Sequence, residues 1–376
     1  MQLTARTIIS YLEELAPQAL ALPDDRIGLQ VGNPDSEINR LVVALDPDQD
    51  ALEKAIEIEA GMLVTHHPMI YRPLTAIDES KPSGRLIATA IRAGLVIYCA
   101  HTNYDIAPDG VSFQLAEALG LPLQEAKVLE VTGEEELFKL VVYVPRGHED
   151  QIRQALSAAG AGQIGRYSHC TFQVAGTGTF LPEEGTSPYI GSSGRLEKVD
   201  EFRLETILPA AAREAVLEAL HSSHPYEEVA YDLYPLRLEG KKWGLGLVID
   251  LSEPKSMEEI ISSCREGLKA PLVRFHAAGN KEFRRIAICG GSGGSLIKDA
   301  VNAGAELYIS GDFRYHDLQQ AAACGLALVD AGHDVTEMPA VLYLQKHLER
   351  KLKQDSHPAE VICLTQRGPN WKVSKE

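Results

Sequence analysis

Short apolar segments alternate with amphipathic stretches in two separate parts of the chain. The first part runs from residue 40 to about residue 125, and the second begins near residue 284. Segments such as RLVVALD (40–46) and RRIAICG (284–290) have the composition of buried strands. Stretches such as DQDALEKAIEIEAG (48–61) have the apolar spacing of helices. This rhythm of strand, helix and strand predicts βαβ units and a mainly parallel sheet in each part.

The two parts also resemble each other in detail. An Ala-Gly pair precedes one apolar segment in each part, at 60–61 and 303–304, and a Gly-Leu pair precedes the next, at 94–95 and 325–326. In the first part these two segments end at His66-His67 and His101-x-x-x-Asp105, and in the second at Gly311-Asp312 and His333-x-x-x-Glu337. We infer an internal duplication, which predicts that the ends of equivalent strands converge.

Residues 128–237 follow a different order. Their segments indicate strand, helix, strand, strand, helix and strand, which fits a ferredoxin-like α+β unit. The flanking stretches are charged and contain glycine, as linkers commonly do. We therefore expect a duplicated, layered α/β domain made from residues 1–127 and 238–376, into which a ferredoxin-like domain of residues 128–237 is inserted.

Composition restricts the functional classes. The net charge of -17 argues against a general nucleic-acid-binding surface, because such surfaces neutralise phosphates with clustered Lys and Arg. No apolar run reaches the ~18–20 residues of a membrane span, and the N-terminal stretch lacks the apolar segment of a signal peptide. The cysteines form no C-x-x-C pair, so we expect reduced thiols and a cytoplasmic protein. These cysteines are Cys99, Cys170, Cys264, Cys289, Cys324 and Cys363.

The segment Thr65-His66-His67-Pro68 follows an apolar strand. Ligands of open α/β sheets bind beyond the carboxyl ends of strands, and imidazole is a common ligand for Zn, Mn and Fe. Adjacent residues of an extended strand point to opposite faces, so both histidines can serve one site only if the strand ends there. Pro68 favours that ending. Taken alone, a His-His pair is more often incidental.

The motifs His101-x-x-x-Asp105 and His333-x-x-x-Glu337 strengthen the metal hypothesis. Residues four apart share a helical face, and each pair offers one imidazole and one carboxylate, which can bridge two ions. Three strand ends would thus supply enough ligands for two divalent ions, with Zn, Fe, Mn and Co all compatible. The alternative is that these are ordinary surface or capping residues. The expected ligands are His66, His67, His101, Asp105, His333 and Glu337.

The chain resembles the NGG-one-interacting-factor-three-like (NIF-three-like) family in several ordered blocks. These blocks are GLQVG (28–32), VTHHPMIYRPL (64–74), YCAHTNYDIAPDGV (98–111), AICGGSGG (287–294), YISGDFRYHD (308–317) and AGHDVTEMPAV (331–341). The resemblance covers the whole chain outside the insertion. Members are often labelled homologues of GTP cyclohydrolase 1 type 2.

The resemblance implies a dinuclear metal site formed by the six residues named above, none of which departs from the family motif. It also implies a PII-like or CutA-like insertion, matched by HPYEEVAYDLYPL at 224–236, and a toroidal homohexamer. The stretch Asp24-Asp25-Arg26 departs from the Trp-Asp sequence of many members. We expect this departure to affect only the surface or entrance of the site.

Other candidate residues give weaker evidence of a functional site. The glycine-rich segment from Cys289 to Ser295 could cradle phosphate, but it has no P-loop lysine. Close backbone packing near the metals is the favoured interpretation. Asp312 and His316 could orient ligands or exchange protons with a metal-bound water, whereas helix capping and a polar helix face are the simpler alternatives.

Within the insertion, His221, His224 and Glu227 offer metal-binding groups, but Pro225 interrupts their pattern. We expect a helix end followed by a turn. Tyr226 and the aromatic residues of 231–234 fit an interface or core better than a ligand site.

Two functional hypotheses use the same six residues. The first is a metal-dependent hydrolase acting on a nucleotide or a related phosphate-bearing small molecule. The second is a non-catalytic scaffold that senses or delivers metal and reports through the insertion. A third, a transcription-associated partner, follows only from the family's name, and the acidic charge makes direct DNA contact unfavourable.

Overall fold

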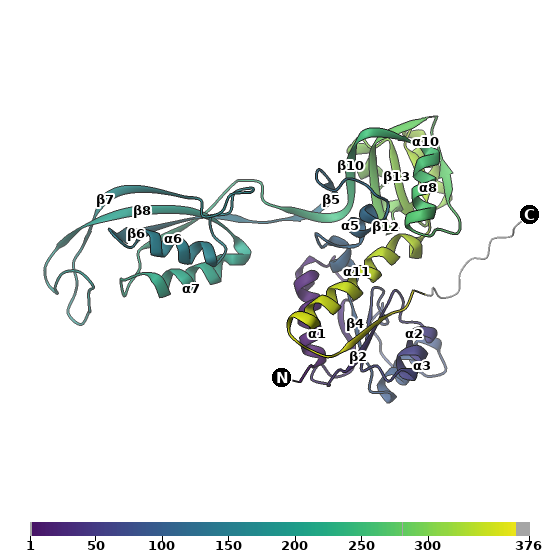
Figure 1. Cartoon of the computed structure of the whole chain (residues 1–376), viewed down its shortest axis with the longest axis horizontal. Helices are drawn as coiled ribbons and strands as arrows, with labels where there is room; N and C mark the ends of the chain where they lie inside the picture. Colours follow the sequence, from purple (N-terminus) through teal and green to yellow (C-terminus); the bar gives the residue numbers. More distant parts are fainter. Residues whose placement is uncertain (1, 280, 366–376) are drawn as a thin grey trace, which may run out of the picture. The chain divides into compact units, whose positions relative to one another are not determined.

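The structure, a computed structural model, describes residues 2–279 and 281–365 (Figure 1). These residues form a mixed α/β fold in two compact units. The first unit combines the described residues of Met1–Gly133 and Trp243–Glu376, and the second is Glu134–Lys242. Within the described residues, no helix is long and apolar enough to cross a membrane.

The first unit contains a five-stranded sheet in the order β1-β4-β3-β2-β15. Strands β2, β3, β4 and β15 run parallel, and β1 is antiparallel to β4. Every residue of β3 and β4 is buried, as expected for parallel strands covered on both faces. The strands are β1 (Gly28–Val31), β2 (Arg40–Ala44), β3 (Met62–Thr65), β4 (Val96–Cys99) and β15 (Glu360–Cys363).

A six-stranded sheet in the same unit has the order β11-β14-β13-β12-β10-β5. Strands β12, β13 and β14 run parallel, whereas β11 and β10 are antiparallel to their neighbours. The order β11-β14-β13-β12 repeats the order β1-β4-β3-β2, so the two sheets share one topology over four strands. The strands are β5 (Lys127–Glu134), β10 (Lys242–Ser256), β11 (Arg274–His276), β12 (Glu282–Ser292), β13 (Leu307–Gly311) and β14 (Ala327–Asp330).

Helices cover these sheets, and their ends follow local sequence signals. Asp48 accepts a hydrogen bond from the backbone N–H of Ala51 at the start of α2, and Ser256 and Glu259 form a capping box on α8. The helices of the unit are α1 (Ala5–Leu15), α2 (Gln49–Glu57), α3 (Pro82–Arg92), α4 (Thr102–Ile106), α5 (Val111–Ala118), α8 (Met257–Gly267), α9 (Ile297–Asn302), α10 (Tyr315–Ala323) and α11 (His333–Gln354). Short 3-10 turns are η1 (Gln18–Leu20) and η3 (Gly294–Leu296).

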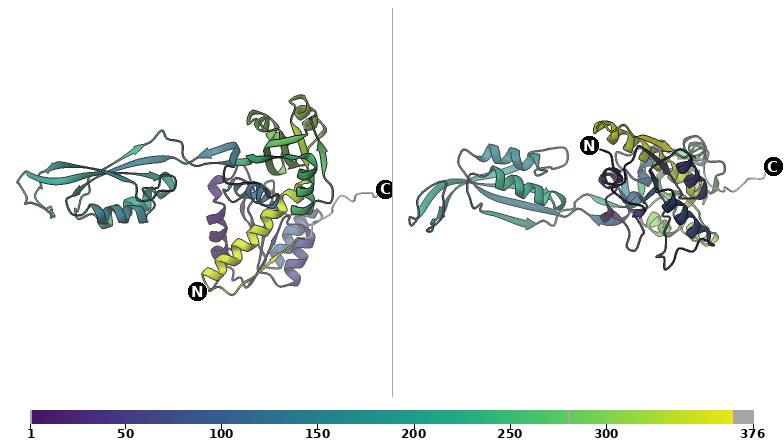
Figure 2. Two further views of the ribbon diagram at one scale, coloured as in Figure 1. Left: turned by 45° about the horizontal axis from the view of Figure 1, so that its top comes forward. Right: turned by 90° about the horizontal axis from the view of Figure 1, so that it is seen from below.

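Helix α11 connects the two sheets of the first unit. It begins directly after β14 of the six-stranded sheet, and its apolar face packs into the core beneath the five-stranded sheet through Met338, Leu344 and Leu348. Figures 1 and 2 show it running from one sheet to the other. The chain then returns as β15 and adds a strand beside β2.

The second unit follows the order β6-α6-β7-β8-α7-β9, which is the predicted order of strands and helices. Its four strands form an antiparallel sheet in the order β7-β8-β6-β9, as in a split βαβ arrangement. Leu140, Leu204 and Val216 lie in a core of its own. The elements are β6 (Leu137–Pro145), α6 (Glu149–Ala158), β7 (Thr171–Phe180), β8 (Glu197–Pro209), η2 (Ala210–Ala212), α7 (Arg213–Ser223) and β9 (Tyr231–Pro235).

Candidate metal centre

The first two predicted ligands lie where β3 ends. The strand stops at Thr65, whose hydroxyl donates a hydrogen bond to the carbonyl oxygen of His67 at 2.7 Å and so turns the chain. The backbone N–H of His67 is still held by the carbonyl of Leu45, at 2.9 Å. The rings of His66 and His67 therefore lie on the same side, with their centroids 5.1 Å apart.

The other predicted ligands lie on two equivalent helix starts. His101 is the N-cap residue of α4 and Asp105 lies in that helix, whereas His333 is the first residue of α11 and Glu337 lies one turn later. The two residues of each pair therefore lie on the same face of their helix. Because β4 and β14 occupy equivalent places in their sheets, the two pairs are related by the duplication.

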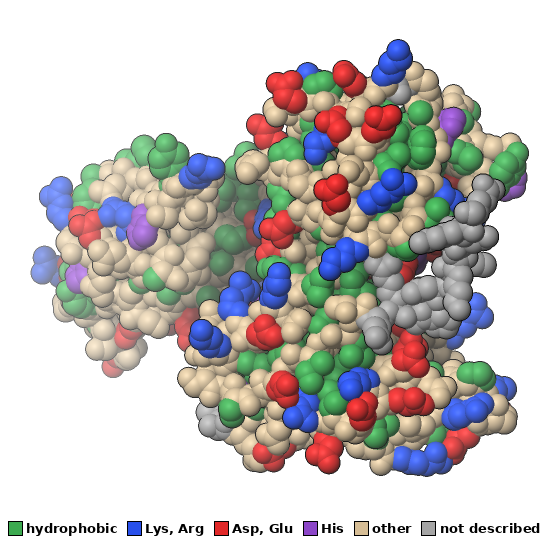
Figure 3. Space-filling view, turned by 45° about the vertical axis from the view of Figure 1, so that its right-hand side comes forward, with side chains coloured by type: hydrophobic (Ala, Val, Ile, Leu, Met, Phe, Trp, Pro, Cys, Tyr) green, Lys and Arg blue, Asp and Glu red, His purple; other side chains and the backbone are tan. Residues whose placement is uncertain are grey.

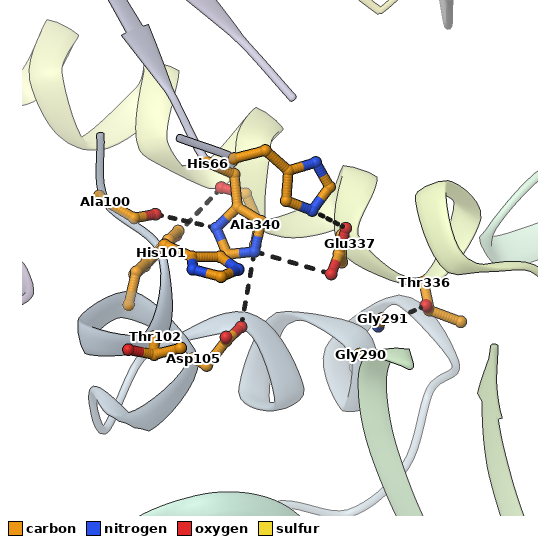
Figure 4. Close-up of polar contacts among 12 residues, drawn as sticks. His66, Ala100, His101, Thr102, Asp105, Gly290, Gly291, Thr336, Glu337 and Ala340 are labelled. Atoms are coloured by element: carbon orange, nitrogen blue, oxygen red, sulfur yellow. Dashed lines mark hydrogen bonds and ion pairs between the residues drawn. The ribbon is translucent and has the colours of Figure 1, made fainter. Parts of the chain in front are cut away.

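Glu337 contacts several imidazoles of the cluster, and Figure 4 shows its contact with His66. One of its oxygens, Oε1, lies 3.7 Å from His66 Nε2 and 3.2 Å from His333 Nε2. The other, Oε2, lies 3.3 Å from His67 Nε2. Asp105 Oδ1 is 3.6 Å from His66 Nε2. One carboxylate thus contacts three imidazoles.

Two sets of ligand atoms lie close enough to share an ion. One atom from each of His66, His67 and His101, and one from each of His67, His333 and Glu337, lie within 4.8 Å of one another. His67 belongs to both sets, and its Nε2 is 3.4 Å from His333 Nε2. The six predicted residues are therefore brought together at one place in the first unit.

In each of the four histidines, the ring nitrogen Nδ1 donates a hydrogen bond to a nearby oxygen. Nδ1 of His66 donates to the carbonyl oxygen of Ala100 at 2.9 Å. The remaining three Nδ1 atoms donate to carboxylates: His67 to Asp46 at 2.7 Å, His101 to Asp25 at 2.9 Å and His333 to Asp312 at 2.9 Å. With Nδ1 protonated, each Nε2 carries a lone pair, which is the form that binds a metal ion.

Two buried atoms of the cluster lack hydrogen-bond partners among the described residues. They are Nε2 of His66, whose residue is only 2 % exposed, and Oε2 of Glu337. Buried polar atoms are rarely left unpaired, because desolvation is costly. Divalent ions would satisfy both atoms, so the residues present fit a metal centre of mixed imidazole and carboxylate ligands.

The electrostatics of the cluster depend on burial and on close opposite charges. Burial alone would raise the pKa of Glu337, but the neighbouring imidazoles of His333 and His66 outweigh it and hold that pKa well below its usual range. Burial lowers the pKa of His67, whereas Asp46 and Glu337 raise it to about 10. Burial also lowers the pKa of His333, whereas Glu337, its main partner, raises it to about 9. Without metal, the carboxylates therefore favour protonated imidazoles, and an ion would replace those protons.

The two candidate acid/base residues, Asp312 and His316, have different contacts in the structure. Asp312 holds His333 and has a positive φ of 56°, in the left-handed region that aspartate tolerates. His316 instead contacts Gln319 on its own helix α10, at 3.1 Å, and its side chain is exposed. Asp312 is therefore attached to the cluster, whereas His316 is part of a polar helix face.

Two carboxylates that contact the predicted ligands, Asp46 and Asp25, were not predicted from the sequence. The Asp25 side chain is 6 % exposed and contacts His101, so the expectation that this stretch affects only the surface or entrance is wrong for Asp25. Burial alone would raise the pKa of Asp25, but hydrogen bonds from His101 and Thr102 outweigh it and hold the pKa far below its usual range. Asp46 follows β2 directly, where the position of a carboxylate at a strand end was the available signal.

The glycine-rich segment packs against the cluster. The backbone N–H of Gly291 donates to the hydroxyl of Thr336 at 2.9 Å, and the hydroxyl of Tyr308 donates to the carbonyl of Gly293 at 2.9 Å. A Cβ added at Gly291 would lie 2.2 Å from Oε1 of Glu337. These contacts support close backbone packing as the role of the segment.

In the insertion, His224 has both ring nitrogens occupied by the backbone. Its Nε2 donates to the carbonyl of Tyr143 at 3.1 Å, and its Nδ1 accepts from the N–H of Tyr226 at 3.1 Å. The ring of His221 lies edge-on to Tyr231, and the Glu227 carboxylate accepts from the N–H of Ser187. These contacts explain the residues as parts of a helix end and turn.

Nearly the whole chain is similar to known proteins. The sequence profile of the family Duf34/NIF3 (NGG1p interacting factor 3) matches residues 3–369. A protein of Halalkalibacterium halodurans called GTP cyclohydrolase 1 type 2 homolog is 42 % identical over 358 residues, covering 95 % of each chain. A Bacillus subtilis protein of the same name is 41 % identical over 326 residues, covering 87 % of each.

Among solved structures, a Bacillus cereus protein described as related to NIF3 is 38 % identical, with a TM-score of 0.91 over 100 % of both chains. A Staphylococcus aureus protein, 24 % identical, has a TM-score of 0.77 over 99 % of both chains and shows the same fold.

Proposed function

This chain belongs to the Duf34/NIF3 family, and from that membership and the geometry of the cluster we propose that it is a metal-dependent hydrolase. The ligands would be His66, His67, His101, Asp105, His333 and Glu337, holding two divalent ions among Zn, Fe, Mn and Co. The observation that carries the proposal is the convergence of these side chains. Each Nδ1 is occupied, and the buried His66 Nε2 has no hydrogen-bond partner among the described residues.

When bound, a pair of divalent ions supplies Lewis-acid activation of a water and of a phosphoryl or carbonyl oxygen. The protein's own contribution is to hold the ligands rigidly. Glu337 contacts three imidazoles from two different segments, and so keeps the two halves of the site in register. Asp312 is the candidate acid/base group, because it lies beside His333 while its side chain is 62 % exposed to solvent.

For the substrate, we propose a nucleotide or a related phosphate-bearing small molecule. The support is the name GTP cyclohydrolase 1 type 2 homolog carried by the relatives. The inserted unit would be a PII-like or CutA-like domain, supported by its strand order, and the 41.0 kDa chain would assemble as a homohexamer. A cytoplasmic location accords with the described cysteines, which are all free.

Figure 3 shows Lys and Arg side chains intermixed with Asp and Glu on one face of the first unit. This face has no broad basic surface, so it gives no support to direct nucleic-acid binding. A small-molecule substrate accords better with the position of the cluster at the strand ends.

The test is a screen of metal-loaded protein against nucleotides and phosphoesters, with His66→Ala and His101→Ala beside the wild type. Each variant loses a ligand, so we expect turnover to fall by at least about 100-fold, which is the scale of a lost transition-state contact. The matched control is His357→Ala, since His357 follows the C-terminal end of α11, outside the cluster. Wild-type protein that holds two ions and remains inert toward every substrate would favour the metal-sensing scaffold instead.

A further inference from the structure

A loop residue remote in sequence from every predicted ligand holds one of the imidazoles. Asp25 lies between η1 and β1, 76 positions before His101. Its Oδ1 and Oδ2 lie 2.9 Å and 3.0 Å from His101 Nδ1. Because an ionised carboxylate only accepts hydrogen bonds, Nδ1 must carry the proton and Nε2 must be free.

The same carboxylate also caps helix α4. Its Oδ2 accepts from the backbone N–H of Thr102 at 3.1 Å and from the Thr102 hydroxyl. The Thr102 hydroxyl oxygen in turn accepts from the N–H of Leu22 at 3.0 Å, and the N–H of Arg26 donates to Oδ1 of Asp25 at 2.8 Å. Four donors therefore converge on one carboxylate, whose side chain is only 6 % exposed.

We propose that Asp25 is a positioning residue of the metal centre, which fixes the tautomer and the direction of His101 and thereby sets the affinity for one of the two ions. The inference rests on the metal centre proposed above. A carboxylate behind a ligating histidine commonly changes metal affinity by about 10–100-fold. Here the effect is linked to the fold, because the contacts that orient the imidazole also start the helix carrying Asp105.

The other two carboxylates have the same relation to their histidines but weaker support. The side chains of Asp46 and Asp312 are 46 % and 62 % exposed, so water competes for their contacts with His67 and His333. We therefore expect Asp25 to affect metal binding more than Asp46 or Asp312 does.

Asparagine is the informative substitution at Asp25 because it preserves shape and removes one acceptor. With its oxygen toward Thr102, its NH2 group faces Nδ1 of His101 and favours the tautomer that has hydrogen on Nε2, which cannot bind an ion. With the amide reversed, the NH2 group faces the N–H of Thr102 and the cap is lost. Neither orientation satisfies all four donors.

The experiment measures Zn²⁺ affinity of the full-length chain by competition with a chromophoric chelator, and the visible absorption of the Co²⁺-loaded protein. Asp25→Asn should weaken at least one of the two binding steps by about 10-fold or more and alter the Co²⁺ spectrum. Thr102→Val is the matched control, because it removes a hydrogen bond to the same carboxylate without touching Nδ1. It should lower the thermal midpoint while keeping Zn²⁺ affinity within about threefold and the spectrum unchanged.

The outcomes separate this inference from the proposed function. Wild-type protein that binds neither ion would contradict the metal centre itself. Wild-type binding of two ions with unchanged affinity in Asp25→Asn would overturn the role of Asp25 alone. Equal losses of affinity in Asp25→Asn and Thr102→Val would also overturn it, since Asp25 would then act only as a helix cap.

Discussion

The space occupied by the Glu337 carboxylate exists because residue 291 has no side chain. Gly291 has a φ of 70°, and an added Cβ would lie 2.2 Å from Oε1 of Glu337 and 3.5 Å from Nε2 of His333. Its N–H also binds the hydroxyl of Thr336, the residue before Glu337. The glycine thus holds the first turn of α11 close while leaving room for the ligand.

Gly291→Ala should therefore displace Glu337 and weaken Zn²⁺ binding by about 10-fold or more, in the range seen when the surroundings of a ligand are disturbed. Gly325→Ala is the matched control, because Gly325 has a φ of 71° and open space around its Cβ position. Both variants should lose about 1–2 kcal/mol of stability from backbone strain. Chelator competition and urea unfolding measure the two effects, and equal Zn²⁺ affinities in the two variants would contradict the role of Gly291.

At the scale of single residues, the sequence predicted where the candidate ligands lie along the chain better than it predicted which residues contact them. His66 and His333 could be placed at strand ends, because apolar segments followed by polar residues mark those ends. Their capacity to hold ions stays a prediction. The contact of His101 with Asp25 spans 76 residues, and that of His67 with Asp46 spans 21 residues. No local spacing marks such pairs, so only the folded chain shows them.

Helix α11 also carries a buried histidine far from the cluster. Nε2 of His347 donates to the carbonyl of Tyr11 at 3.0 Å, and its Nδ1 lies 3.0 Å from a donor nitrogen of Arg350. Both nitrogens are thus used by a neutral ring. Burial, with the positive charges of Arg350 and Lys351, lowers the pKa of His347 from its ordinary value of 6.5.

Protonation of His347 should loosen the packing of α1 on α11. Because its pKa is lower in the folded state, its contribution to stability is complete above pH 6.5 and is lost as the pH falls below that value. Glutamine can still donate to the carbonyl of Tyr11 but does not titrate. Measured by urea unfolding from pH 7.5 to 5, the stability of the wild type relative to His347→Gln should decrease with acidification. A pH-independent difference would argue against this effect.

Among the elements of the first unit, the interior parallel strands were predictable, whereas the short edge strands β1, β11 and β15 were not. β3 and β13 are fully buried and mainly apolar, with Thr65 and Ser310 as their polar residues, so their pattern is strong. β1, β11 and β15 have four, three and four residues and lie at the edges of their sheets. Such short edge strands are formed by pairing with a neighbour rather than by their own pattern.

At the scale of the whole molecule, the insertion and the first unit have separate interiors. Each hydrophobic cluster formed by the described residues lies within a single unit. The chain leaves the first unit at Gly133 and returns at Trp243, and these two residues are neighbours, since a Cβ on Gly133 would lie 2.3 Å from Nε1 of Trp243.

Replacement of Glu134–Lys242 by Asn-Gly should therefore give a hairpin between β5 and β10 and a first unit that folds. The cluster residues all lie in that unit, so we expect two Zn²⁺ ions per chain and affinities within about threefold of the full-length protein. Elemental analysis and chelator competition measure both. The excised unit, expressed alone, should unfold cooperatively, as a domain with its own core does. Loss of Zn²⁺ binding in a soluble, folded deletion variant would show that the insertion supports the centre.

The pairing of β15 with β2 affects the order in which the chain acquires structure during synthesis. Glu360 lies opposite Arg40, and the helix that covers the first core begins only at His333. A ribosome releases the N-terminal segments first, so β2 and its neighbours emerge long before these two partners. The second unit, Glu134–Lys242, has its own core and can form in that interval. We therefore expect the N-terminal half to stay exposed to proteases and chaperones until β15 pairs with β2.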